Sequence, residues 1–143
     1  MKYGKIDAAA HKLTVIESGS WDSAKMMCGL KPLETDHGTI RHMEGEGGIG
    51  IVVAEYGLFE PPLNQHYFAI GANLYAGDAM LFAYDGAGET IDFDDRELPI
   101  RWFATAQEVE RAIAMGEIAR PAIRFNGATM WQWPDPPAPG TRR

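Results

Sequence analysis

The chain has 143 residues, of which 45% are hydrophobic and 23% are charged, a composition typical of a globular domain and not of a disordered chain. Thirteen basic residues against twenty acidic ones leave a net charge of −7. Binding to a phosphate backbone needs the opposite balance, so we expect no direct nucleic-acid binding. The single cysteine, Cys28, cannot form an internal disulfide, which favours a reducing compartment. No apolar run approaches the ~20 residues that span a bilayer, and Met1–Ala10 lacks the apolar region of a secretory signal. We therefore expect a cytoplasmic protein without membrane contact.

A strand, a capped helix and an extended segment are predicted in the first quarter of the chain. Leu13–Glu17 is rich in β-branched residues and predicts a short strand. Ser20 is placed to cap a helix over Trp21–Cys28, and Gly29 is placed to end it. Leu30–Glu34 is expected to be extended and to lie at a sheet edge, because it contains a proline.

Glycines dominate the next segment, Thr35–Gly50, where the pattern predicts little order beyond a strand at Thr39–Met43. Within it, Gly45–Gly50 matches the letters of the G-x-G-x-x-G dinucleotide motif. That motif binds pyrophosphate only where it follows a strand and opens a helix. Here it leads into Ile49–Tyr56, the most apolar predicted strand, so we interpret it as a mobile glycine loop.

The middle of the chain predicts one short helix and a hairpin. Asn64 is placed to cap a helix that runs to about Ala69, and a loop follows through Gly71 and Asn73. Further on, the predicted strands are Asp78–Tyr84, Glu89–Phe93 and Ile100–Phe103, with a turn at Asp85–Gly88 joining the first two.

The last third predicts a helix and a tight hairpin. Thr105 and Glu108 have the spacing of a capping box, and the helix they begin should end at Gly116. Asn126-Gly127 is typical of a two-residue type I′ turn. The register that this turn predicts pairs Phe125 with Ala128, Arg124 with Thr129, Ile123 with Met130, Ala122 with Trp131, and Arg120 with Trp133. We expect a single domain over residues 1–133 and a flexible, proline-rich tail over 134–143.

The predicted hairpin carries the first candidate site. In the register above, one face of the ribbon holds Arg120, Arg124, Trp131 and Trp133. Such residues can stack on a base and grip a phosphate, and they are also frequent in protein–protein hot spots. A structural role, with the tryptophans covering the core under the arginine stems, remains a third alternative. Asn64 and His66 are added as possible ligand contacts, because a helix N-terminus favours an anion, although capping alone explains Asn64.

Other polar groups supply alternatives. An acidic cluster, Asp92, Asp94, Asp95 and Glu97, is a candidate surface for a basic partner, or simply an acidic turn. His37 and His42 lie near several carboxylates, but their spacing fits no standard metal site, so we expect no bound metal. Cys28 lacks a cationic neighbour in the pattern and is interpreted as a small buried hydrophobe.

Short motifs between Ile49 and Phe93 carry a family resemblance. The chain contains IVVAEYG, PPLN, GDAMLF and DGAGE in this order, and the matching positions are Glu55, Gly57, Leu63, Asn64, Gly77 and Asp78. Over roughly residues 13–93 this order resembles the domain-of-unknown-function family 3846, small accessory proteins of phages and plasmids. The glycine-rich loop before Ile49 and the tryptophan-rich hairpin depart from the family. The resemblance carries over no catalytic residue and implies a small accessory protein of mobile DNA, of the kind that acts by binding.

Together these observations predict an α+β domain with a mostly antiparallel sheet and two or three helices on one face. We expect a non-catalytic binding protein of phage or plasmid origin that sequesters a small nucleotide-type ligand, with a pocket possible at a homodimer seam. The alternative is a protein-interaction inhibitor that blocks a host defence protein through its acidic surface. A third hypothesis, an enzyme, would rest on His37, His42 and their neighbouring carboxylates. No cofactor is expected.

Overall fold

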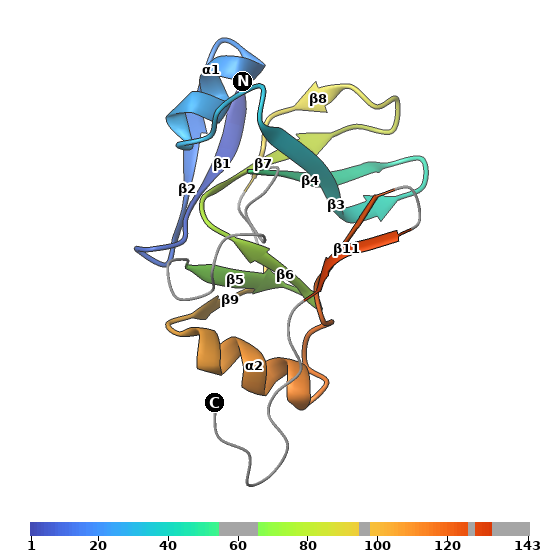
Figure 1. Ribbon diagram of the computed structural model, residues 1–143. Coiled ribbons are helices and arrows are strands. Elements are labelled where there is room, and N and C mark those ends of the chain that lie inside the picture. The colour runs from blue at the N-terminus through green and yellow to red at the C-terminus, as the bar shows by residue number, and fades with distance from the viewer. Residues whose placement is uncertain (55–65, 95–97, 126–127, 133–143) are drawn as a thin grey trace, which may run out of the picture.

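The protein is built in four layers: two antiparallel sheets are stacked on each other, and one helix covers the outer face of each (Figure 1). The computed structural model describes residues 1–54, 66–94, 98–125 and 128–132, and describes side chains as far as residue 121. Helix α1 (Trp21–Met27) packs on the first sheet, and α2 (Ala106–Ala114) packs on the second. The α+β class and the mostly antiparallel pairing are as predicted.

The first sheet has the strand order β2-β1-β7-β4-β3, and every pair is antiparallel. Its strands, in chain order, are β1 (Lys2–Asp7), β2 (Lys12–Glu17), β3 (Thr35–Met43), β4 (Gly47–Ala54) and β7 (Ala79–Tyr84). A short strand, β8 (Thr90–Ile91), pairs with the C-terminal end of β7. It lies on the same edge of β7 as β1, which pairs with the earlier residues of that strand. The backbone of Phe93 donates to the carbonyl of Lys2 over 2.9 Å, so the segment after β8 continues into contact with β1.

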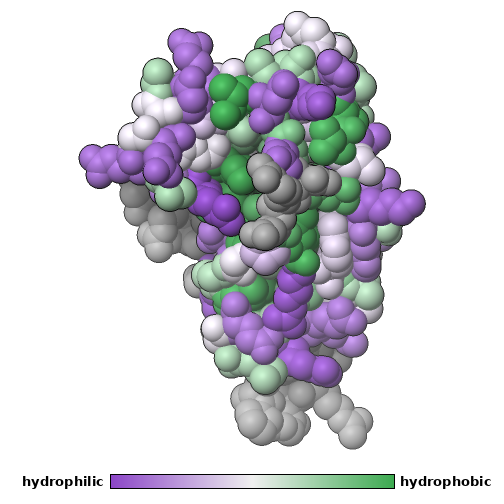
Figure 2. Space-filling view, turned by 180° about the vertical axis from the view of Figure 1, so that it is seen from behind, coloured by the Kyte–Doolittle hydropathy of each residue, from purple (hydrophilic) through white to green (hydrophobic). Residues whose placement is uncertain are grey.

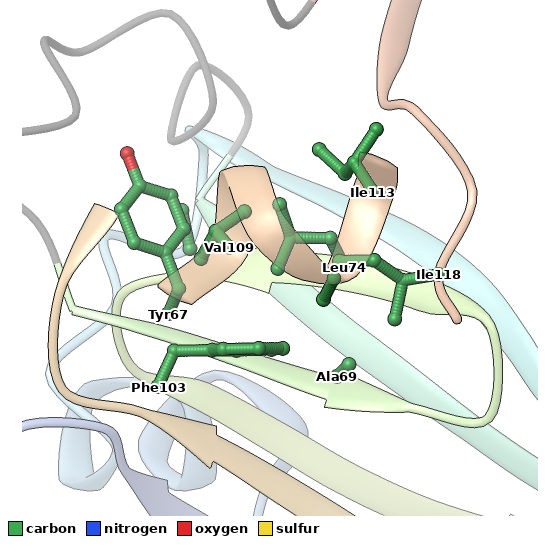
Figure 3. Close-up of a cluster of buried hydrophobic side chains, with 9 residues drawn as sticks. Tyr67, Ala69, Leu74, Phe103, Val109, Ile113 and Ile118 are labelled. Carbon is green, nitrogen blue, oxygen red and sulfur yellow. The ribbon is translucent and has the colours of Figure 1, made fainter. Parts of the chain in front are cut away.

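The second sheet has the order β6-β5-β9, formed by β5 (Tyr67–Ile70), β6 (Asn73–Ala76) and β9 (Ile100–Phe103). Strand β5 lies in the middle and is buried along its whole length. Tyr67 and Ala69 face α2, where they pack with Phe103 of β9 and with Val109 of the helix (Figure 3). The helix predicted from Asn64 to Ala69 is therefore wrong over its second half, which is strand; Asn64 itself lies outside the described residues.

The opposite face of the second sheet packs on the first sheet. Phe68 and Ile70 of β5 belong to the same buried cluster as Ile6 of β1, Ile51 of β4 and Leu81 of β7. Where apolar residues reach the surface on the face seen in Figure 2, they form a broken band down the middle of the molecule, bordered by hydrophilic residues. The core between the sheets is thus continuous from β1 to β9.

Both helices begin and end where their capping residues predict. The Ser20 hydroxyl accepts a hydrogen bond from the backbone of Ser23 over 3.1 Å, and the Thr105 hydroxyl accepts one from Glu108 over 3.2 Å. The two glycines that follow have left-handed backbones, with φ of +78° at Gly29 and +72° at Gly116. These conformations satisfy the last helical carbonyls without the strain that a side chain would bring.

Several predicted details need correction. The two helices of the described chain cover different sheets and do not share one face. Leu30–Glu34 contains a turn and no strand, while β1 and β6 were not predicted at all. Much of the glycine-rich segment is ordered into β3 and β4, because Gly47–Gly50 pair with β7 and β3. The predicted tail, 134–143, lies outside the described residues.

None of the helices in the described part of the chain is long and apolar enough to cross a bilayer.

The cap of α2 gives a direct test of helix stability. We expect Thr105→Ala to lower the free energy of unfolding by about 1 kcal/mol, because the amide of Glu108 loses its acceptor. The matched control, Thr105→Ser, keeps the hydroxyl and should stay close to the wild type. Urea denaturation followed by circular dichroism measures both, and equal stability of the alanine and serine variants would contradict this role of the cap.

Candidate functional site

The hairpin that carried the first candidate site is formed, but with a shifted register. Strands β10 (Ala122–Phe125) and β11 (Ala128–Gln132) pair Phe125 with Ala128 and Arg124 with Thr129, as predicted. A bulge between Ile123 and Arg124 then sets Trp131 opposite Ile123 and Gln132 opposite Ala122, so the predicted pairs of Ile123 with Met130 and Ala122 with Trp131 are wrong. The strict alternation that placed Arg124 and Trp131 on one face does not continue through the bulge, and Trp133 lies outside the described residues.

The remaining members of this predicted site are not brought together. His66 is exposed just before β5, and its backbone carbonyl accepts from Gly77 over 2.8 Å at the open end of the β5–β6 hairpin. Arg120 is half-buried and follows Ala119. The backbone amide of Ala119 donates to the carbonyl of Ala72 over 2.7 Å, at the end of the β5–β6 hairpin where its turn lies. The four residues of β5, about 13 Å of strand, separate these two ends.

The acidic cluster has a structural role in addition to its charge. Asp92 and Asp94 are both exposed, and the Asp92 carboxylate accepts a hydrogen bond from the backbone of Lys2 over 2.9 Å. With Lys2, Val15 and Phe93 they line an open depression of about 490 Å³ at the β1–β2 side of the first sheet. Asp95 and Glu97 lie outside the described residues.

The two histidines of β3 lie against aromatic rings. Across the described side chains there is no group of three or more histidine, cysteine, aspartate or glutamate residues that could hold a metal ion. His37 instead stacks on Trp21, with ring centroids 5.8 Å apart and an interplanar angle of 16°. His42 stacks on Tyr84 at 5.9 Å, and its Nδ1 forms a hydrogen bond with the Tyr84 hydroxyl at 3.0 Å.

These two contacts are the ends of one aromatic surface, which we call the aromatic shelf. Its rings belong to α1, β3 and β7, and its members are Trp21, His37, His42, Phe82 and Tyr84. Phe82 connects the two ends, because its ring lies 5.0 Å from Trp21 in an edge-on contact and 6.2 Å from Tyr84. Both histidines are exposed and the other three rings are half-buried, so the shelf is open to a ligand.

Glycines of β4 make room for the shelf. Gly50 is paired with Phe82 and Gly48 with Tyr84, so each ring can lie across the glycine opposite it. A Cβ atom at Gly50 would meet the Phe82 ring, with its Cε1 only 2.6 Å away. One at Gly48 would first meet the backbone carbonyl of Arg41, and would also lie 2.7 Å from the Tyr84 hydroxyl oxygen. The rings are therefore held down on strand β4 because these positions carry no side chain.

A second histidine–tryptophan stack lies elsewhere in the molecule. His11, in the turn between β1 and β2, stacks on Trp102 of β9 with centroids 5.5 Å apart and an interplanar angle of 9°. His11 has a left-handed backbone, with φ of +53°. The same kind of stack thus occurs outside the shelf, where it joins the β1–β2 turn to the second sheet.

The shelf has the chemistry of a binding surface. Trp21 and Phe82 offer apolar rings, while His42 and Tyr84 offer one hydrogen-bonded polar pair. The Cys28 thiol is no nucleophile for this surface: it is buried, and burial raises its pKa to about 11. Its interpretation as a small buried hydrophobe is confirmed.

Comparison with family models, with curated proteins and with solved structures finds no match to this chain. The resemblance to family 3846 therefore stays a prediction.

Sequence reasoning missed the shelf because its rings come from three separated segments. Two signals were present. In β4, Gly48 and Gly50 alternate with apolar residues, which leaves two successive positions on one face of the strand without side chains. In β7, Phe82 and Tyr84 alternate in the same way on the neighbouring strand. A pair of alternating glycines beside a pair of alternating aromatic residues indicates rings that lie across a sheet.

Gly50 provides the test of this arrangement. We expect Gly50→Ala to destabilise the protein by about 1–3 kcal/mol, because the methyl group displaces the Phe82 ring. The control is Gly19→Ala, where a Cβ would meet nothing within 4 Å. Thermal and urea unfolding compare the two variants. If Gly50→Ala were as stable as Gly19→Ala, the ring would not be held against β4.

Proposed function

We propose that the protein is a non-catalytic binding protein and that the aromatic shelf binds the planar ring of a small nucleotide-type ligand. The observation that carries the proposal is the continuous run of ring contacts from His37 through Trp21, Phe82 and Tyr84 to His42, in which both histidines are exposed and the other three residues are half-buried. Every nucleobase has a π-face, and stacking on an aromatic side chain contributes about 1–3 kcal/mol per base.

The glycine contacts favour binding because they reduce its entropic cost. Phe82 and Tyr84 already lie across Gly50 and Gly48, so a ligand does not have to order these side chains. The His42–Tyr84 pair also offers a polar group beside the rings, where a base edge can form a hydrogen bond. Apolar rings with a few placed polar groups are typical of small-molecule sites.

Two earlier expectations remain proposals beside this one. The residues Arg120, Arg124, Trp131 and Trp133 stay candidates for ligand or partner contacts on the C-terminal hairpin. Origin from a phage or plasmid, with sequestration of a nucleotide signal as the biological role, rests on the family resemblance alone.

The proposed stacking is tested with the four common ribonucleosides as probes. Isothermal titration calorimetry should detect binding of at least one of them to the wild-type chain. Removing one ring with Tyr84→Leu should weaken that binding by about tenfold, in line with the loss of a single stacking contact. His11→Leu is the matched control, because it removes a histidine ring from the other tryptophan stack.

Circular dichroism of each variant separates lost binding from lost folding. A wild-type protein that binds none of the four nucleosides would contradict the proposed function. So would a folded Tyr84→Leu variant with unchanged affinity.

A second candidate function is the capture of a basic protein partner. The observation that favours it is the open depression beside Phe93, where the exposed carboxylates of Asp92 and Asp94 flank apolar surface. Apolar surface bordered by charge suits a partner with basic residues around an apolar contact. This proposal preserves the role first inferred for the acidic cluster.

Neutralising the two carboxylates tests the second candidate. Asp92→Asn with Asp94→Asn should slow association with an oligolysine peptide at low salt, because charge complementarity acts mainly on the association rate. The asparagine at position 92 keeps an oxygen that can accept from Lys2. Glu44→Gln with Glu46→Gln removes the same charge from the β3–β4 turn and should change the rate less. Equal rates for both double variants would contradict a specific acidic surface.

A further inference from the structure

Strand β2 forms one outer edge of the first sheet, because it pairs with β1 and with no other strand of the described chain (Figure 1). Just beyond its end, Met1 and Ser18 exchange two hydrogen bonds, the Ser18 amide donating over 3.0 Å and the amine of Met1 over 3.2 Å. The backbone groups of successive strand residues point to opposite sides, so every second residue of β2 faces β1. The residues between them, whose N–H and C=O groups point away from the sheet, are Leu13, Val15 and Glu17.

These outward backbone groups are open to a further strand. Within the described residues, no other element forms a hydrogen bond with the backbone of Leu13, Val15 or Glu17. The strand is also regular, since its six residues pair one to one with β1 and include no bulge, glycine or proline. A regular, exposed edge of this kind is a template for pairing with another chain.

The opposite edge of the same sheet is less suited to an incoming strand. Strand β3 carries a bulge between Thr39 and Arg41 and has a further charged residue, Asp36, within its length. Bulges and charged side chains both protect an edge against pairing with another chain. In β2 the charges stand only at the two ends, at Lys12 and Glu17. Of the two edges, β2 is therefore the one on which an incoming strand can pair without interruption.

The open depression of about 490 Å³ begins at this edge, at Val15, which is 41% exposed. Gly4 of β1 pairs with Val15, and a Cβ atom at Gly4 would lie 2.8 Å from Cε1 of Phe93, so the ring crosses β1 where a side chain is missing. The carboxylates of Asp92 and Asp94 follow on the far side of β1, where the segment after β8 bonds to that strand. A long side chain from an added strand thus meets apolar surface first and carboxylates beyond it.

We propose that β2 takes up a basic, extended segment of a partner protein as an additional antiparallel strand. The inference rests on the second candidate function and deepens it, because it names the form in which a basic partner binds beside Asp92 and Asp94. In complexes of this type the backbone hydrogen bonds provide affinity, and alternate side chains of the added strand provide specificity. The antiparallel direction follows the rest of the sheet, in which every pair is antiparallel.

The charges around this edge identify the partner as basic. A lysine or arginine opposite Val15 can lay its apolar stem across Val15 and bring its charge to Asp92 and Asp94. Glu17 is exposed on the same face of β2, and the cation that also lines the depression, Lys2, is paired with it across the two strands. The acids therefore remain in excess. A second copy of this chain would instead bring the same acids and another net charge of −7 to the edge.

A capped seven-residue peptide in which lysine alternates with valine is the probe. In the proposed register the lysines share the face of Val15, so the lysine amides point toward β2 and the valine amides point away. We expect calorimetry at low salt to detect binding of this peptide to the wild-type protein. Methylating the backbone amides of the lysines should weaken binding about tenfold, because hydrogen bonds to β2 are lost. Methylating the valine amides is the matched control and should change the affinity little.

The same hydrogen bonds can be removed from the side of the protein. Val15→Pro eliminates an outward amide that does not bond to β1, and it should weaken peptide binding about tenfold. The same alternation, continued through β1, β7 and β4, leaves the Thr39 amide pointing outward on the opposite edge. Thr39→Pro is therefore the matched control and should keep the affinity. Circular dichroism verifies the fold of both variants, and the methylated peptides decide the question if Val15→Pro does not fold.

The outcomes separate this inference from the candidate function on which it rests. Asp92→Asn with Asp94→Asn should weaken peptide binding about threefold. If these substitutions weaken binding but methylation of the lysine amides does not, strand addition is overturned and the acidic surface stands. If the peptide does not bind, or binds the double variant equally well, the inference is overturned, and the oligolysine rates decide whether the candidate function stands. A dimer of the protein alone, detected by sedimentation and dissociated by Val15→Pro, would overturn the inference in favour of a second copy.

Discussion

The fold depends on a four-residue strand that is buried on both faces. Along β5, Tyr67 and Ala69 belong to the cluster beneath α2, while Phe68 and Ile70 belong to the cluster shared with the first sheet. None of the four is more than 5% exposed. Because successive side chains of a strand point to opposite faces, this short segment holds two cores together, and neither the second sheet nor α2 can pack without it. Burial on both sides is the reason that the molecule has four layers.

The two outer faces of this stack are closed in different ways. The nine residues of α2 cover a sheet of three short strands, and its apolar residues complete the cluster around Tyr67. The seven residues of α1, about 10 Å of helix, are set against a sheet with five strands in its main path. Helix α1 covers Val52 and Met80, and beyond it the sheet is covered by its own rings, Phe82 and Tyr84, which lie across glycines. The shelf is thus a consequence of a helix too short for its sheet.

How far the sequence predicts this arrangement depends on whether the deciding interaction is local. Both helix starts were predicted, because a cap is decided by residues three positions apart. Strand β5 was mistaken for the end of a helix, since a segment buried on both faces has no alternation, and a short apolar run alone does not separate helix from strand. The register beyond Arg124 failed because one bulged residue is invisible in a pattern of alternation. The shelf could be predicted only from Gly48 and Gly50 in combination with residues more than thirty positions away.

The same contacts that stabilise the shelf also fix the rings on which the proposed binding depends. The Phe82 ring lies against Gly50 of β4, the Tyr84 hydroxyl lies against Gly48, and Phe82 also contacts Trp21 and Tyr84, so these side chains are already fixed in place. A fixed ring loses little entropy on binding, which makes even a shallow surface effective for a flat ligand. Apolar rings do not by themselves discriminate between bases. For the proposed ligand, selectivity must therefore come from the polar groups at the two ends of the shelf, His37 and the His42–Tyr84 pair, which can form hydrogen bonds with a base edge.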